Sequence, residues 1–258
     1  MDLNIKSDTV DKAIEIIEDS TKETRNALDQ KTSRGINKLF DLLKSTPIGI
    51  KAEVYIQERP YKLKLAMDEM KKKYENIPQV NRTEPSSYIA LKGVNELNYC
   101  LDEDYLKEMF ENLLVSDMDT RKQGRVLPAY IEIIKQLSNN DAKFLKTLND
   151  LRKLKFSNFP ILKIIYVDSN KNPIYNENDL ILIDISTENV TQIPAIVIEN
   201  LLRLNIIEIS FSNYLPNNSI YANAFHKLVE NKKDLFDFKK GMLNITNYGL
   251  NFIDICLS

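Results

Sequence analysis

Hydrophobic residues recur at helical spacing through the first hundred residues of the chain. Within residues 9–45 apolar side chains stand three or four positions apart, which predicts one long helix or two, with a break near residues 32–35. The same spacing predicts a helix over residues 55–74, although Pro60 lies inside it, and a short helix over residues 88–101. The N-terminal third of the protein is therefore expected to be helical.

The hydrophobic pattern is clearest in the central part, where three predicted helices follow one another closely. Asp102 is the expected N-cap of the first, whose apolar residues form adjacent pairs four positions apart. Pro128 suits the first turn of the second helix, because that position needs no backbone N–H. Ser138, followed by Asp141 three residues later, is a variant of the capping box and predicts the start of the third. The expected apolar faces comprise Tyr105, Leu106, Met109, Phe110, Leu113, Leu114, Tyr130, Ile131, Ile134, Leu137, Ala142, Leu145, Leu148 and Leu151.

After Lys155 the pattern changes to short apolar runs separated by turns. Residues 161–167 and 180–185 predict a β-hairpin around the turn-rich segment 168–179. The remaining predicted elements are a helix over 193–207, a strand over 208–211, a helix over 220–230, a strand over 243–245 and a last helix capped by Thr246.

This order of elements predicts a mainly α protein with α+β character. We expect an N-terminal helical region over residues 1–101 and a central helical segment over residues 102–155 that joins the two halves. Residues 156–258 are expected to form a winged-helix-like module with a small antiparallel sheet. A chain of 258 residues has the length for two small modules, since domains typically run to roughly 100 to 200 residues.

The composition supports a folded protein and excludes several classes of partner. Hydrophobic residues make up 43% and charged residues 28% of the chain, enough apolar material for a core. The net charge of -2 gives no bulk attraction to nucleic acid or anionic lipid. The chain starts without a basic segment followed by an apolar run, and no stretch of about 18 apolar residues occurs. Two cysteines are too few for a disulfide framework, so we expect a soluble, cytoplasmic protein.

Residues that could carry chemistry are few. His226 is the only histidine, which excludes a two-histidine zinc site and most catalytic triads, and a surface or half-buried role is expected for it. Cys100 and Cys256 stand among apolar residues on predicted helices, where a free cysteine usually behaves as a small buried hydrophobe. Six glycines leave little room for a phosphate-binding loop.

Two further patterns resemble sites but fit simpler structures better. Asp168, Asn170 and Asn172 have the spacing of a calcium loop, but Pro173 replaces the required glycine and Asp179 stands where a bidentate Glu belongs. A hairpin turn is therefore predicted there.

A metal-dependent nuclease could use Glu132 and Lys135, yet both lie on an amphipathic helix whose solvated face explains their charges. The sequence thus predicts no catalytic, cofactor-binding or metal-binding residue.

Nucleic-acid binding is the alternative that a winged-helix pattern suggests. The candidate recognition helix over residues 193–208 has Arg203 as its one cation, opposed by Glu199 and Glu208. Lysines near the predicted wing could contact a phosphate backbone, but acidic residues are interleaved with them. The lysines are Lys232, Lys233, Lys239 and Lys240, and the acidic residues are Glu230, Asp234 and Asp237.

The central segment and the C-terminus together resemble the Abi-alpha family of bacterial abortive-infection proteins. The resemblance is strongest over residues 102–148, recurs over residues 190–257 and reduces to a helical pattern before residue 76. It rests on Glu108-Met-Phe-Glu-Asn-Leu-Leu114, Ser116-Asp-Met-Asp119, Leu127-Pro128-Ala-Tyr-Ile-Glu-Ile-Ile-Lys-Gln-Leu137, Ser138-Asn-Asn-Asp-Ala-Lys-Phe-Leu145 and Leu243-Asn-Ile-Thr-Asn-Tyr-Gly-Leu-Asn-Phe252 with Cys256. Where relatives often have His-Pro, this chain has Leu127-Pro128, so a catalytic role for that histidine is excluded here.

The resemblance implies a role in phage defence, in which infection triggers growth arrest or death of the host cell. Our first hypothesis is a non-enzymatic protein whose C-terminal module recognises a phage or host protein. The alternatives are a nucleic-acid binder that disturbs phage replication or transcription, and a toxic metal-dependent nuclease-like enzyme. Self-association through the N-terminal helices stays open, because their apolar stripe is interrupted.

Overall fold

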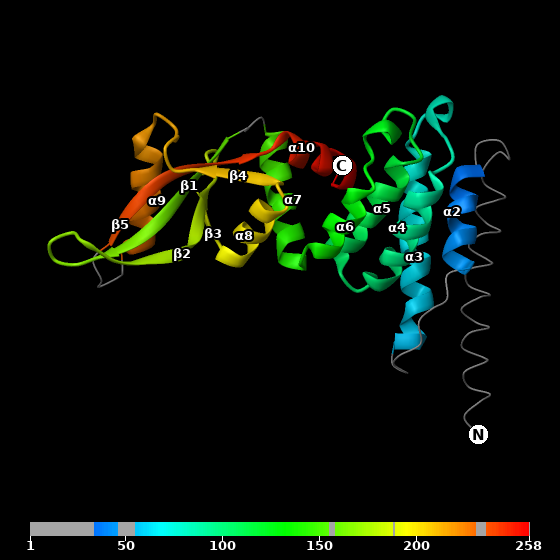
Figure 1. The fold of residues 1–258 in the computed structure, drawn as a ribbon, viewed down its shortest axis with the longest axis horizontal. Helices are drawn as coiled ribbons and strands as arrows, with labels where there is room; N and C mark the ends of the chain where they lie inside the picture. The colour runs from blue at the N-terminus through cyan, green and yellow to red at the C-terminus, as the bar shows by residue number, and fades with distance from the viewer. Residues whose placement is uncertain (1–33, 46–54, 155–157, 188, 231–235, 258) are drawn as a thin grey trace, which may run out of the picture. The chain divides into compact units, whose positions relative to one another are not determined.

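The computed structural model describes residues 34–45, 55–154, 158–187, 189–230 and 236–257 (Figure 1). The chain divides into two compact units, Met1–Ala142 with Asp254–Ser258, and Lys143–Ile253. We call the first the helical unit and the second the sheet unit. The division at residues 101 and 155 that the sequence suggests stays a prediction.

The helical unit contains the helices that the hydrophobic spacing predicts. Pro60 lies inside α3, as expected, within its first turns. The predicted helix before residue 34, with most of the break at residues 32–35, lies outside the described residues. The described elements are α2 (Arg34–Ser45), α3 (Tyr55–Glu75), η1 (Gln79–Asn81), α4 (Ser87–Tyr99), α5 (Asp104–Ser116), η2 (Gln123–Arg125) and α6 (Ala129–Gln136).

Helix α5 is the centre of this unit, because it packs against α3, α4 and α6. Its apolar pairs four positions apart are buried as predicted, from Leu106 to Leu114. Gly93 of α4 lets the two helices approach closely, since a Cβ there would lie 2.8 Å from Cδ2 of Leu114. The repeated apolar pair thus specifies both a helix and the core around it.

Of the two helix N-caps predicted in the central segment, the one at Ser138 is confirmed and the one at Asp102 is wrong. Ser138 and Asp141 form the predicted capping box at the start of α7 (Asn139–Lys153): the Ser138 N–H donates to Asp141 Oδ2 at 2.7 Å, and the Asp141 N–H donates to Ser138 Oγ at 3.2 Å. Asp102 is not the N-cap of α5, which is Glu103. Asp102 instead forms an ion pair with Lys62 of α3, so a tertiary contact uses the carboxylate that the local pattern assigned to the cap.

The sheet unit is built on a five-stranded antiparallel sheet with the order β3-β2-β1-β5-β4. The predicted hairpin is confirmed as β1 and β2, and the predicted strand at residues 243–245 is the end of the longer β5. The sequence did not predict β3. A mainly α protein with α+β character is confirmed, whereas the winged-helix likeness stays a prediction. The strands are β1 (Asn158–Val167), β2 (Pro173–Ile183), β3 (Val190–Ile193), β4 (Ile207–Ser210) and β5 (Phe236–Ile245).

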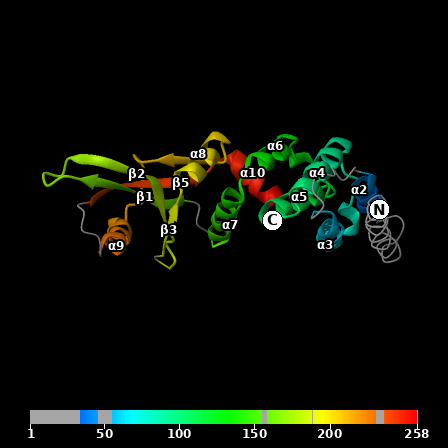
Figure 2. The same ribbon diagram turned by 90° about the horizontal axis from the view of Figure 1, so that it is seen from below.

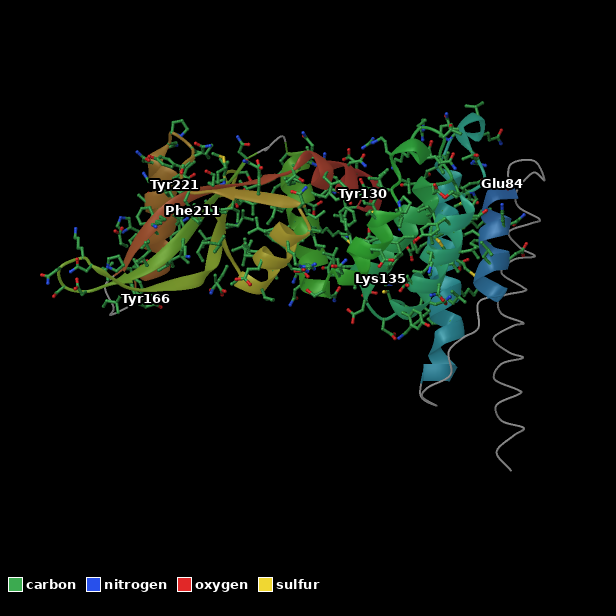
Figure 3. The ribbon with its side chains drawn as sticks, in the orientation of Figure 1. Glu84, Tyr130, Lys135, Tyr166, Phe211 and Tyr221 are labelled. Carbon is green, nitrogen blue, oxygen red and sulfur yellow. The ribbon has the colours of Figure 1, made fainter. Side chains whose placement is uncertain are left out.

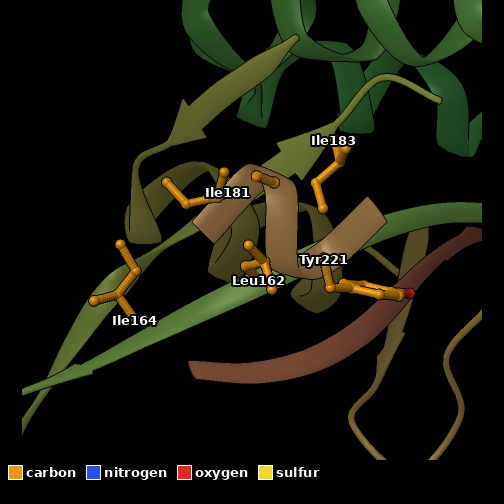
Figure 4. Packing of buried hydrophobic residues seen from close by; sticks show 6 residues of the cluster. Leu162, Ile164, Ile181, Ile183 and Tyr221 are labelled. Carbon is orange, nitrogen blue, oxygen red and sulfur yellow. The ribbon is translucent and has the colours of Figure 1, made fainter. Parts of the chain in front are cut away.

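Helices lie on both sides of the sheet. Figure 2 shows α8 (Ala195–Arg203) and α9 (Asn218–Val229) on opposite faces, and α10 (Asn247–Cys256) follows β5. Leu162, Ile164, Ile181 and Ile183 project to the α9 side and pack against Tyr221 and Ala224 (Figure 4). Their neighbours Ile161, Ile165, Leu180 and Leu182 are buried on the other side, because side chains alternate along a strand.

Candidate functional site

Polar residues of α5 and of its C-cap, in the segment that carries the family resemblance, are buried in the helical unit. Glu111 is 2% exposed, and Asn112, Ser116 and Asp117 are also buried. Burying a polar group is costly unless it is hydrogen-bonded, so the partner of each residue shows what it does.

Glu111 forms an ion pair with Lys73 of α3, with 2.7 Å between Lys73 Nζ and Glu111 Oε2. The second carboxylate oxygen, Oε1, is buried and has no hydrogen-bond partner among the residues that the structure describes. Burial raises the pKa of Glu111, and the ammonium of Lys73 opposes that rise without cancelling it. Glu111 is thus held between the helices in an environment that disfavours its charge.

Asn112 and Ser116 bind the end of the chain to α5. The Asn112 side-chain amide donates to the carbonyl of Cys256 at 2.9 Å, and Ser116 Oγ donates to the carbonyl of Ile255 at 3.1 Å. The last carbonyls of a helix have no partner within the helix. These two side chains therefore satisfy the C-terminus of α10 within the helical unit.

Asp117 stabilises the start of α4. Its Oδ2 accepts hydrogen bonds from the N–H of Ser86 at 2.7 Å and from Ser86 Oγ at 2.9 Å. Burial raises the pKa of Asp117, and both hydrogen bonds to Ser86 lower it in part. The nearby Asp119 accepts a hydrogen bond from Arg121 Nε at 2.9 Å, which holds its pKa below the usual range. Together these carboxylates fix the connections between helices.

In the sheet unit two aromatic side chains are exposed after β4. Phe211 is 39% exposed and Tyr214 is 44% exposed. Figure 3 shows Phe211 and Tyr221 in the same part of the unit, at the sheet and at α9. We call residues 211–217 the aromatic segment. The sequence pattern placed Phe211 in a strand and did not single out Tyr214, although two aromatic residues at and just after the end of a predicted strand were a visible signal.

Contacts of Ser210 and Gly241 hold the start of the aromatic segment in place. Ser210 Oγ accepts hydrogen bonds from the N–H groups of Ser212 and Asn213, which turns the chain directly after β4. The ring of Phe211 lies on Gly241 of β5, where an added Cβ would stand 2.7 Å from Phe211 Cδ1. The position of Phe211 therefore depends on a glycine in the neighbouring strand.

Tyr221 of α9 fixes the other end of the segment. Its hydroxyl accepts a hydrogen bond from the N–H of Leu215 and donates one to the carbonyl of Gly241, each at 3.1 Å. Tyr214 stands edge-on to Tyr221, with 6.4 Å between the ring centroids. Lys240 Nζ lies 4.6 Å from the Tyr214 ring centroid and donates to Asn218 Oδ1. The two exposed rings are thus held in place by contacts within the chain itself, and we call them braced.

His226 and the two cysteines occupy the unremarkable positions that the sequence suggested. His226 is exposed on α9 beside Phe225, with 6.1 Å between the ring centroids. Cys100 is half-buried at the end of α4, and burial raises the pKa of its thiol to about 11. Cys256 is fully buried, which raises its pKa well above the usual value. Neither thiol has the lowered pKa that marks a reactive cysteine.

The segment that resembles a calcium loop is a hairpin turn, as predicted. Asp168 Oδ1 accepts hydrogen bonds from the N–H groups of Asn170 and Asn172, and Lys171 adopts a φ of 64°. Asp168 therefore closes the β1–β2 turn with its own side chain.

Glu132 and Lys135 form an ion pair along α6, and Lys135 also pairs with Glu96 of α4 at 3.1 Å. Across the described ranges, no three His, Cys, Asp or Glu side chains are grouped so that they could hold a metal ion. The nuclease alternative has no residues assigned to it and stays a prediction.

The cationic side chains that the sequence offered for nucleic-acid binding differ in their contacts and exposure. Arg203 donates to Asn200 Oδ1 within α8, and Lys239 is exposed on β5. Lys232, Lys233 and Asp234 lie outside the described residues. In the part of the chain that is described, none of the helices combines the length and the apolar character needed to cross a membrane.

A family model described as abortive infection alpha matches residues 58–256, which is most of the chain. No curated protein matches the chain, and no solved structure does.

Proposed function

The chain belongs to the abortive infection alpha family, and from this premise we propose that it acts in bacterial defence against phage through contact with another protein. Family membership suggests abortive infection, the response in which an infected cell stops growing or dies. The partner would be a phage or host protein, recognised by the sheet unit.

The exposed, braced rings of Phe211 and Tyr214 carry this proposal. Aromatic residues are enriched in the centres of protein interfaces, where a few side chains supply most of the binding energy. A ring that is already held in place loses little conformational entropy on binding. Tyr221 and Gly241 provide that support here, so the aromatic segment has the properties of a recognition surface.

The buried polar residues of α5 and its C-cap support the same proposal. Asn112, Ser116 and Asp117 hydrogen-bond to groups of the chain itself, which positions helices. The most distinctive polar residues of the central segment thus have a structural role that accounts for them.

The proposal is tested by replacing both rings and measuring protection of cells against phage. Phe211→Ser with Tyr214→Ser removes two exposed apolar groups, and losing a binding hot spot of about 2 kcal/mol weakens an interface roughly thirtyfold. Protection is expected to fall while the double variant remains folded at the growth temperature, which circular dichroism checks. Ile196→Ser is the matched control, because Ile196 is an exposed apolar residue on α8 of the same unit.

Full protection by the double variant would contradict the proposal for this surface. A large fall with Ile196→Ser as well would show that loss of any exposed apolar residue reduces protection, and would also count against it.

We further propose that the protein acts in the cytoplasm. Cys100 and Cys256 are both free thiols, as is typical of proteins in a reducing compartment.

Nucleic-acid binding is the second candidate function, favoured by Tyr214 beside Lys240 and by the exposed Lys239. Aromatic rings next to cations are used to bind single strands. However, the ammonium of Lys240 lies over the ring of Tyr214 and donates to Asn218, so both groups are already engaged. A titration with single-stranded DNA at several salt concentrations decides: phosphate contacts must give affinity at low salt, and no binding there rejects this candidate.

A further inference from the structure

Strand β5 has a second strand beside it over only part of its length. β1 pairs with β5 from Phe236 to Asn244, whereas β4 pairs with it only from Met242 to Ile245. Among the described residues, β4 ends at Ser210, opposite Met242, and β5 extends beyond it (Figure 1). Within the described ranges, β5 therefore has a strand neighbour on the β1 side alone from Asp237 to Lys240, while Phe211 and Tyr214 of the aromatic segment lie against Gly241 and Lys240.

The backbone groups that face this open edge follow from the register. The Thr246 N–H donates to the carbonyl of Ile206, on the β4 side, at 3.0 Å. Backbone groups alternate in direction along a strand, so those of Phe238 and Lys240 also point away from β1. Pro160 stands opposite Met242 and has no N–H to donate, which fits a position where the backbone groups of Met242 point away from β1. The N–H of Phe238 donates to Oδ1 of its neighbour Asp237 at 2.8 Å.

The side chains at this edge are complementary to themselves. Asp237 and Lys239 are exposed, carry opposite charges and flank the half-buried Phe238. Phe238 rests on Phe225 of α9, with 4.5 Å between the ring centroids. In an antiparallel pair of two β5 strands centred on Phe238, Asp237 of each copy would stand opposite Lys239 of the other. Opposite charges across a pair of strands stabilise it.

We propose that this open edge of β5 is a homodimer interface, in which two copies of the chain pair antiparallel about Phe238. The two Phe238 backbones exchange hydrogen bonds, and each Asp237 releases its own Phe238 N–H and pairs with Lys239 of the second copy. The contact uses the same residues on both copies, as two-fold symmetry requires. Centring the pair on Lys239 instead would place two lysines face to face, which disfavours that register.

The dimer goes beyond the proposed function and does not depend on it. An unpaired strand edge is a ready template for another strand. In the single chain the carboxylate of Asp237 accepts a hydrogen bond from the N–H of Phe238. In the dimer it would instead face the opposite charge of Lys239 of the second copy. The occupant favoured by the charge pattern is therefore a second copy of this chain.

The test is a charge swap at the edge, read by sedimentation of the full chain. Wild-type protein is expected to sediment as a dimer. Asp237→Lys places lysines opposite Lys239, and Lys239→Asp places carboxylates opposite Asp237, so each is expected to weaken the dimer by at least about tenfold. The double variant Asp237→Lys/Lys239→Asp restores opposite charges and is expected to return to nearly the wild-type affinity. Both residues are exposed, so circular dichroism should show the wild-type fold.

Lys92→Asp is the control, because it makes the same change of charge as Lys239→Asp on an exposed residue of α4. It should leave the mass unchanged. A wild-type monomer up to about 100 µM, near the weak end of specific association, would overturn the proposal. So would a dimer that the single variants leave intact, or a double variant no better than the single ones. Loss of protection in the Phe211 and Tyr214 variant tests the proposed function separately, because that variant leaves Asp237 and Lys239 in place.

Discussion

At the scale of single residues, Lys73 and Glu111 show how burial changes the value of an ion pair. The carboxylate of Glu111 is 2% exposed, whereas the side chain of Lys73 is 27% exposed. Lys73 therefore keeps some contact with water, whereas the buried carboxylate of Glu111 depends on Lys73 to balance its charge. Removing one partner of a buried pair leaves an uncompensated charge, which costs more than the pair itself contributes.

We predict that Lys73→Met lowers the free energy of unfolding at pH 7. Breaking a fully buried pair costs about 3 to 5 kcal/mol, and the partial exposure of Lys73 reduces the expected loss to about 2 kcal/mol. The loss should shrink as pH falls, because a raised pKa means that the folded protein binds the Glu111 proton more tightly than the unfolded chain does. The stabilisation that the folded protein gains from binding this proton is complete below pH 4.5, the ordinary pKa, and disappears as pH rises through the raised pKa of Glu111. Urea unfolding at several pH values measures both.

Glu111→Gln provides the comparison. It removes the charge whose burial is unfavourable, so it should change the stability at pH 7 by no more than about 1 kcal/mol. In the double variant with Lys73→Met most of the Lys73→Met loss should be recovered. A loss that is independent of pH, or one that Glu111→Gln does not relieve, would show that Lys73 stabilises the fold in another way.

At the scale of elements, the start of α10 is determined by a close approach to the chain before β4. Thr246 Oγ accepts a hydrogen bond from the N–H of Gly249 and donates to the carbonyl of Asn205. The predicted cap is therefore confirmed, and it also joins two segments. A Cβ at Gly249 would lie 2.1 Å from the carbonyl oxygen of Ile206, a backbone atom that cannot turn aside.

Gly249→Ala is therefore expected to destabilise the protein by about 3 kcal/mol, because the helix or the chain at Ile206 must shift. Thermal unfolding measures the change. Gly124→Ala is the matched control: an added Cβ at Gly124 meets nothing within 4 Å, so its effect should stay within about 0.5 kcal/mol. Equal effects of the two substitutions would contradict the close approach.

At the scale of the whole molecule, the last residues of the chain complete the helical unit. Asp254–Ser258 belongs to that unit, although the preceding residues belong to the sheet unit. Ile255 and Cys256 are fully buried, and their carbonyls accept from Ser116 and Asn112. The first unit is therefore completed only after the second has been synthesised.

Deleting residues 254–258 should destabilise the helical unit by at least about 3 kcal/mol. The deletion removes three buried side chains, those of Ile255, Cys256 and Leu257, and takes away the carbonyls to which Asn112 and Ser116 donate. Hydrogen exchange of the α5 amides should become faster. Asp254→Asn is the control, since it weakens an exposed ion pair with Arg125 and should cost less than about 1 kcal/mol. Unchanged exchange in α5 after the deletion would contradict the role given to the C-terminus.

Local sequence rules predicted the helices and several of their ends. The paired apolar residues of α5, the Ser138–Asp141 capping box and the Thr246 cap depend on residues three or four positions apart, which neighbour one another in any helix. The hairpin β1–β2 was predictable for the same reason, because its strands are joined by a short turn. The sequence also carried the family resemblance, which the matching family model confirms.

Only the tertiary structure decided what these elements do to one another. The first half of β5, with Phe238 between Asp237 and Lys239, pairs with β1 about seventy residues earlier, and no local pattern specifies such a pairing. The burial of Glu111, the contact of Phe211 with Gly241 and the open edge of β5 likewise depend on residues far apart in the chain. Local spacing determines which element forms, because its partners are neighbours in sequence. Burial and strand pairing determine the sites, because their partners meet only when the chain has folded.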